Sequence, residues 1–125
     1  AQNLFISPPT LSQHVGIASL ADTSEVDEYV KEYKRNRDLL FEALPQCGFG
    51  QLSQVEGGFY IYADVGNLTN DSISFCQQML SEINVAITPG VDFDPERGSR
   101  TVRLSFAGSH ETVEKAVERM RGWRR

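Results

Sequence analysis

Apolar residues in the first third of the chain recur at intervals of three and four, which is the spacing of one helix face. A first run ends at Leu20 and predicts a short helix with Thr10 or Ser12 as its N-cap. A second run follows an Asp-x-x-Glu pattern that resembles a capping box, and it predicts a long helix over residues 23–44. Pro45, with a glycine three residues later, is expected to end this helix.

In the middle of the chain the spacing changes to alternation of apolar and polar residues, as expected for strands with one buried face. Two such strands, over residues 50–55 and 58–65, are joined at Glu56-Gly57-Gly58, where the freedom of glycine at positive φ suits a tight hairpin. Helical and extended spacing then alternate to the end of the chain. The remaining predicted elements are a helix over residues 71–83, a strand over 85–88, a strand over 101–106 and a helix over 109–123.

This order of elements predicts an α+β fold. It favours a small mixed or antiparallel sheet of about four strands that is covered by helices on one face. With 125 residues, of which 40% are hydrophobic, the chain is long enough to form one compact core.

Composition and charge narrow the range of partners. The formal net charge of −5 argues against nucleic acid, because affinity for a phosphate backbone depends on clustered basic residues. No apolar run reaches 18 residues, so no membrane partner is expected. The two cysteines are too few for a disulfide framework, which favours a cytoplasmic protein. His14 and His110 stand apart from cysteines and acidic clusters, so no metal site is expected.

Arg103 is the residue whose position most favours a function. Within the strand predicted over residues 101–106, Val102, Leu104 and Phe106 point to one side and Arg103 points to the other. A guanidinium on a rigid strand can offer a planar pair of donors to a carboxylate. Judged by spacing alone, an ion pair with an acidic residue of a neighbouring strand is the commoner role for such an arginine.

Three blocks of sequence follow one another in the second half of the chain. They are residues 57–64 (GGFYIYAD), residues 85–90 (VAITPG) with Phe93 three residues on, and residues 102–107 (VRLSFA). In this order and at this spacing the blocks resemble the C-terminal part of class I aminotransferases, and the likeness covers essentially all 125 residues. The resemblance implies the small domain of a fold-type I, pyridoxal-phosphate-dependent aminotransferase, similar to the aspartate and aromatic aminotransferases.

The resemblance also implies roles for individual residues. Arg103 matches the arginine of the family's R-x-x-F-A block, which binds the α-carboxylate of the substrate. Gly57 and Gly58 match the family's hairpin glycines, although they could equally serve only as turn residues. Pro89 and Gly90 match the turn that leads to a loop at the edge of the site. Asp94 departs from the pattern, because many members have glycine there, and this leaves the shape of the loop and the side-chain selectivity open.

The cofactor implied by the resemblance has no evident attachment point in this chain. Pyridoxal phosphate forms a Schiff base with a lysine, usually in a desolvated pocket. Lys31, Lys34 and Lys115 all lie on predicted outer faces of helices, and none matches the family's lysine block. We therefore expect this lysine upstream of Ala1, no catalytic or cofactor-binding residue in the chain, and no activity from these 125 residues alone.

For the full-length protein, the resemblance implies a homodimeric enzyme that transfers an amino group between an amino acid and a 2-oxo acid. Residues 1–22 would then be an interface or linker segment continuing from a large domain, and residues 23–125 the small domain. The alternative is a stand-alone ferredoxin-like module that binds a small molecule or regulates without catalysis, because the order of strands and helices is compatible with that fold too.

Overall fold

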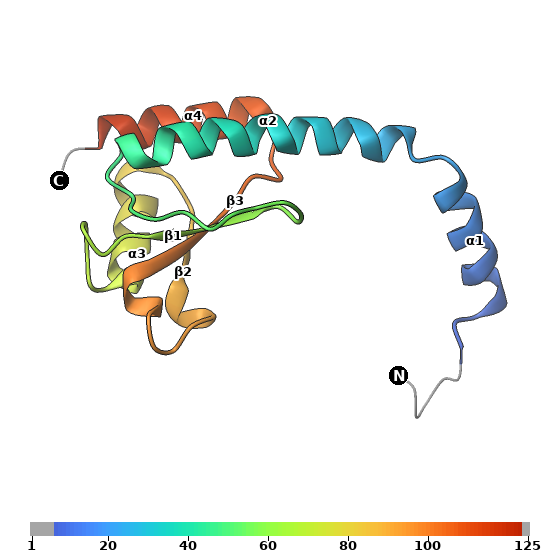
Figure 1. The fold of residues 1–125 in the computed structure, drawn as a ribbon, viewed down its shortest axis with the longest axis horizontal. Helices are drawn as coiled ribbons and strands as arrows, with labels where there is room; N and C mark the ends of the chain where they lie inside the picture. The colour runs from blue at the N-terminus through green and yellow to red at the C-terminus, as the bar shows by residue number, and fades with distance from the viewer. Residues whose placement is uncertain (1–6, 124–125) are drawn as a thin grey trace. The chain divides into compact units, whose positions relative to one another are not determined.

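The computed structural model describes residues 7–123, and the chain divides into two compact units, residues 1–31 and 32–125. The boundary falls inside the long helix α2 (Ser24–Gln46), so that α1 (Thr10–Ala21) and the first turns of α2 belong to the first unit. Figure 1 shows the elements of the second unit after α2. They are β1 (Tyr60–Asp64), α3 (Ser72–Ile83), β2 (Thr88–Pro89), the 3₁₀ turns η1 (Gly90–Asp92) and η2 (Gly98–Arg100), β3 (Thr101–Ser105) and α4 (His110–Gly122).

The first unit is built on the short helix that the hydrophobic spacing predicts. Its N-cap is Pro9 rather than Thr10 or Ser12, because Pro9 is extended and Thr10 is already the first helical residue. The large apolar side chains of α1, such as Leu11 and Leu20, are exposed. In the described part of the chain, no helix is both long enough and apolar enough to cross a membrane.

The second unit has the predicted α+β architecture. Within the described residues its sheet has three strands in the order β1-β3-β2, and both pairings are antiparallel. From Glu32 onward, α2 lies beside α4, and together with α3 these helices cover one face of the sheet (Figure 1). The other face carries the side chains discussed below.

The core lies between the helices and the sheet. Capping side chains fix two of the helices: Asp71 accepts a hydrogen bond from the Ser74 amide, and Ser109 accepts one from the Thr112 amide. The most deeply buried apolar residues come from all layers and include Ala43, Leu44, Ile61, Ala63, Val65, Phe75, Met79, Val102 and Val117. The inward-facing residues of β1 and β3 are those that alternation predicts.

The segment over residues 50–55 is not the regular strand that was predicted. It runs along β1 through separate hydrogen bonds, such as the one from the Ser53 amide to the Tyr62 carbonyl oxygen at 2.8 Å, and a single bridge joins Leu52 and Ala63. The Ser53 hydroxyl accepts the Tyr62 amide hydrogen at 3.0 Å. Because a side chain takes the place of a backbone acceptor, the regular ladder is interrupted.

The strand predicted over residues 85–88 is also shorter than expected, since β2 contains only Thr88 and Pro89. The preceding residues complete the end of α3 instead. Asn84 adopts the left-handed conformation with φ 53°, and the Val85 amide donates to the Met79 carbonyl oxygen. This amide is therefore committed to the helix end and not to a sheet.

Helix α2 runs to Gln46, two residues beyond its predicted end, and contains Pro45 in its last turn. Proline has the φ of a helix and lacks only the donor to the residue four positions earlier. The Cys47 amide closes the turn on the Ala43 and Leu44 carbonyl oxygens, and Gly48, with φ 88°, reverses the chain. Pro45 is therefore the second-last residue of the helix, and the chain changes direction at Gly48.

Candidate functional site

The face of the sheet that points away from the core is polar and aromatic. On β1 it carries Tyr60, Tyr62 and Asp64, which alternate with buried apolar residues. In the register of the sheet, Tyr62 lies opposite Arg103 and Asp64 opposite Thr101. Because side chains directly opposite each other share a face, these five residues form one surface.

Arg103 lies in the middle of this surface and is held by aromatic rings. Its guanidinium carbon lies 4.1 Å from the centre of the Tyr60 ring and 4.0 Å from the centre of the Phe93 ring. The guanidinium thus lies within stacking range of two rings, one from β1 and one from the loop after η1. Contacts of this kind between a cation and a ring face are attractive.

Arg103 has no polar partner within residues 7–123. Its Nε atom is the single buried side-chain polar atom of the described residues that lacks a hydrogen bond. None of the ion pairs formed by the described residues includes this arginine. The terminal nitrogens are not buried, and they are therefore free to donate to an anion that approaches from outside.

The turn at Pro89 and Gly90 lies beside Arg103, because Thr88 pairs with Arg103 and Pro89 with Val102. The Tyr62 hydroxyl donates to the Gly90 carbonyl oxygen at 3.2 Å and accepts from the Thr101 hydroxyl at 2.9 Å. A Cβ atom on Gly90 would lie 2.6 Å from the Thr101 carbonyl oxygen, so only glycine fits this close approach.

The loop after Gly90 presents Phe93 and is fixed by Asp94. The Phe93 and Asp94 amides both donate to the Gly90 carbonyl oxygen at 2.9 Å. The Asp94 carboxylate accepts from the Glu96 and Arg97 amides, each at 3.0 Å, and forms an ion pair with the Arg97 side chain at 3.1 Å. The bond from the Arg97 amide is the main cause that holds the pKa of Asp94 below its ordinary value of 3.8. The departure from glycine at this position thus supplies a charged cap for the loop.

Gly58 occupies the hairpin before β1 with φ 69°, a conformation that glycine adopts without strain. The residue lies two positions before Tyr60, whose ring reaches Arg103. The structure therefore brings Pro89 and Gly90 next to Arg103, whereas Gly58 is related to it through Tyr60.

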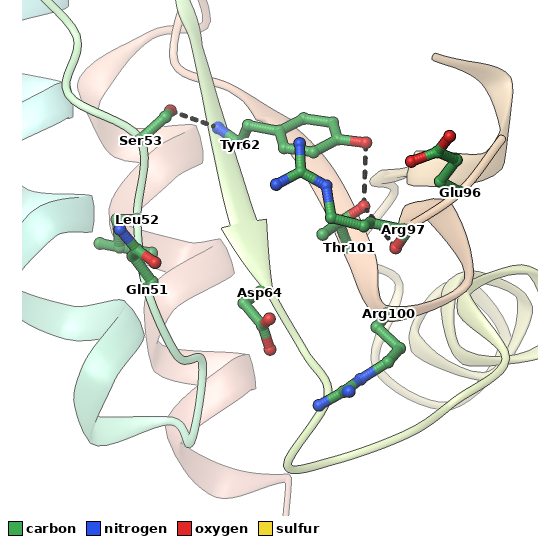
Figure 2. Close-up of a pocket in the computed structure, with 9 residues that line it drawn as sticks. All are labelled: Gln51, Leu52, Ser53, Tyr62, Asp64, Glu96, Arg97, Arg100 and Thr101. Atoms are coloured by element: carbon green, nitrogen blue, oxygen red, sulfur yellow. Dashed lines mark hydrogen bonds between the residues drawn. The ribbon is translucent and has the colours of Figure 1, made fainter. Parts of the chain in front are cut away.

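A separate pocket of about 450 Å³ opens at the other end of the same sheet face. Figure 2 shows Tyr62, Asp64 and Thr101 around it, together with Arg97 and Arg100 from the loop before β3. Its two basic side chains are balanced by Asp64 and Glu96, so the lining favours neither sign of charge. Arg103 does not line this pocket, although Tyr62, which lies opposite Arg103 in the sheet, does.

A buried polar cluster between α2 and α4 was missed by sequence reasoning. The Asn36 side chain is fully buried and donates to the Phe106 and Gly108 carbonyl oxygens at 3.1 and 2.8 Å. Its Oδ1 lies 2.7 Å from His110 Nδ1, and His110 Nε2 lies 3.1 Å from a Glu114 oxygen. Asn36 could have been found from the sequence, because it is four positions before Leu40 on the apolar side of the helix.

Comparison with known proteins identifies the family of this chain. The sequence model of the family described as aminotransferase class I and II matches residues 1–120. The chain therefore belongs to the class I and II aminotransferases.

Individual relatives agree with this assignment. A valine–pyruvate aminotransferase of Mycobacterium tuberculosis is 42% identical over 97% of this chain and 32% of its own length. The crystal structure of an aminotransferase from the same organism has a TM-score of 0.89 at 41% identity, over 97% of this chain and 32% of that one. A Methanococcus jannaschii structure, described as similar in its active site to kynurenine aminotransferases, has a TM-score of 0.82 at 31% identity, over 97% and 32% of the two chains. The chain spans about a third of the length of these relatives.

The residues of this chain do not fit the Schiff-base role that the family's cofactor requires. Lys31 forms an ion pair with Glu28 at 2.6 Å, and both side chains are 71% exposed. Lys115 pairs with Glu111 on the surface of α4, and Lys34 is exposed on α2. These exposed positions lack the desolvated pocket in which a Schiff-base lysine usually lies.

Proposed function

We propose that Arg103 binds the α-carboxylate of the substrate in a pyridoxal-phosphate-dependent aminotransferase of which this chain is the small-domain part. The observation that carries the proposal is a guanidinium held between two rings with no acidic partner within residues 7–123. An arginine retained for structure alone would normally be paired, because a buried donor without an acceptor costs free energy. A carboxylate from the substrate would complete its hydrogen bonds.

The proposed role of the chain is to bind and orient. In the full-length enzyme, pyridoxal phosphate would carry the amino group between an amino acid and a 2-oxo acid. Arg103 would fix one end of the substrate through charge-assisted hydrogen bonds from its terminal nitrogens. Fixing the carboxylate limits the directions in which the α-carbon can point, and positioning of this kind contributes to both binding and rate.

The remaining expectations for the full-length protein stay part of the proposal. These are a homodimer, a cytoplasmic location, and a division into residues 1–22, which continue from a large domain, and the small domain over residues 23–125. One observation supports the location: Cys47 and Cys76 are free thiols, as is usual for proteins of a reducing compartment. Membership in the aminotransferase family speaks against the ferredoxin-like regulatory module as an alternative.

The test is to replace Arg103 by leucine in the full-length enzyme. With two charge-assisted hydrogen bonds lost, KM for every amino-acid substrate is expected to rise about 100-fold or more. Arg103→Lys keeps the charge but loses the planar fork, so its KM should lie between those of the wild type and the leucine variant.

Arg119→Leu is the matched control. This arginine lies on α4, on the helix side of the sheet, and within residues 7–123 its side chain donates to the Asn84 carbonyl oxygen alone. Steady-state kinetics of the control should equal those of the wild type. Equal kinetics for Arg103→Leu and the wild type would overturn the proposed function.

A further inference from the structure

The two rings that contact Arg103 are partly exposed. Phe93 is 49% and Tyr60 is 40% exposed, and neither belongs to the buried core. Both ring centres lie well within the distance of about 6 Å at which a cation is attracted to a ring face. We propose that Phe93 and Tyr60 are positioning residues, which hold the Arg103 guanidinium in the orientation that receives a carboxylate. This inference rests on the proposed function of Arg103.

The need for positioning follows from the length of the arginine side chain. A free arginine loses considerable rotational entropy when it is fixed by a ligand, and a group that is fixed beforehand binds more tightly. No hydrogen bond from another residue between 7 and 123 holds the Arg103 guanidinium. The ring contacts are therefore the interactions that restrict it. Since Nε is buried, they also leave only the edge formed by the two terminal nitrogens for an incoming carboxylate.

Each ring is itself supported from behind. Phe93 follows η1, in a loop closed by hydrogen bonds to the Gly90 carbonyl oxygen and by the Asp94 cap. Tyr60 is packed against Phe59, with ring centres 4.4 Å apart, and Phe59 in turn contacts Tyr33 of α2 at 6.4 Å. The first support is a hydrogen-bonded loop and the second is a row of aromatic rings. The two rings, Phe93 and Tyr60, are called the clamp below, and each can be replaced without disturbing the support of the other.

The test compares Phe93→Leu with the wild type in the full-length holoenzyme. Leucine keeps an apolar side chain but lacks the ring, so KM for amino-acid substrates is expected to rise about 3- to 30-fold with little change in kcat. Phe93→Tyr retains the ring and should restore the wild-type KM. Tyr60→Leu should raise KM within the same range, which gives a second measurement if one variant fails to fold.

A binding experiment separates positioning from general damage to the site. Two probes derived from leucine are measured by titration calorimetry: 4-methylpentanoate, which has the carboxylate but no amine, and 3-methylbutylamine, which has the amine but no carboxylate. Phe93→Leu should weaken only the carboxylate probe, by about the same factor as KM. Equal weakening of both probes, or no change in KM for either ring variant, would falsify the clamp.

Val91→Ala serves as the control. Val91 lies in η1, two residues before Phe93, and is 38% exposed, but its side chain has no ring that could stack on Arg103. It should match the wild type in both measurements.

The outcomes also separate the two proposals. If Arg103→Leu raises KM and the ring variants do not, the clamp alone is wrong, whereas unchanged kinetics in Arg103→Leu remove the proposed function itself.

Discussion

Asn36, in the core of the second unit, and Arg103, on the outer face of its sheet, are both polar side chains that are at least partly buried, and their environments differ. Asn36 is fully buried, and its amide nitrogen and oxygen both meet partners, in the turn that follows β3 and on α4. Arg103 is half-buried, its Nε meets no acceptor within the described residues, and its charge faces two aromatic rings. The sheet separates them, since Asn36 belongs to the helix layer.

The difference indicates what each residue is retained for. A buried amide with every hydrogen bond made joins two helices to the end of the strand that carries Arg103, and this contributes to stability. A cation with an unused donor contributes little to stability but leaves free hydrogen-bonding capacity for a ligand. We therefore expect substitution of Asn36 to affect folding and substitution of Arg103 to affect binding.

The largest effect on stability is expected for Asn36→Leu. The two carbonyl oxygens of Phe106 and Gly108 would lose their donor inside the protein, and an unsatisfied buried group costs about 1–3 kcal/mol. Unfolding of the chain in urea, followed by circular dichroism, should show a loss of about 3 kcal/mol.

Arg35→Leu is the control for this substitution, because Arg35 is the neighbouring residue and is exposed. Its effect should stay within about 0.5 kcal/mol. A loss of less than about 1 kcal/mol in Asn36→Leu would contradict the structural role assigned to this cluster.

The sequence predicted the helices and the central strand because these depend on apolar residues with a clear period. The inward-facing residues of β3 and the helix caps at Asp71 and Ser109 were predictable in the same way, from residue spacing and type. The irregular segments depend on single hydrogen bonds that a periodic pattern does not contain. The Ser53 hydroxyl accepts the hydrogen bond of the Tyr62 amide in β1, and the Val85 amide donates to the Met79 carbonyl oxygen in α3. Two predicted strands are therefore largely replaced by loops.

In the candidate site, too, residue spacing predicts one part of the structure and does not predict another. The place of Arg103 on the outer face follows from alternation, and its matching block suggested the ligand. The ring of Phe93 reaches Arg103 only because the Gly90 turn and the Asp94 cap fold the loop back over the sheet. That contact joins residues of two segments, and spacing within either segment contains no signal for it.

A smaller effect concerns the pH dependence of the loop that carries Phe93. The pKa of Asp94 is lower in the folded protein than its ordinary value of 3.8, chiefly because the Arg97 amide donates to it. The stabilisation is thus present above pH 3.8 and is lost as the pH falls through the lower, folded pKa. In an acid titration by NMR, the Glu96 and Arg97 amide signals should shift with a midpoint below 3.8. Asp94→Asn should abolish this titration, and a midpoint above 3.8 in the wild type would contradict the cap.

The smallest effect on stability is expected where the effect on binding is largest. Arg103→Leu removes two ring contacts, which contribute about 0.5–1 kcal/mol each at exposed sites. It also removes a buried donor without a partner in residues 7–123, and this relieves a cost of about 1–3 kcal/mol. The two terms nearly cancel, so the urea unfolding of the variant should lie within about 1 kcal/mol of the wild type. A loss above about 2 kcal/mol would mean that Arg103 holds the fold together as Asn36 does, and the contrast between the two residues would disappear.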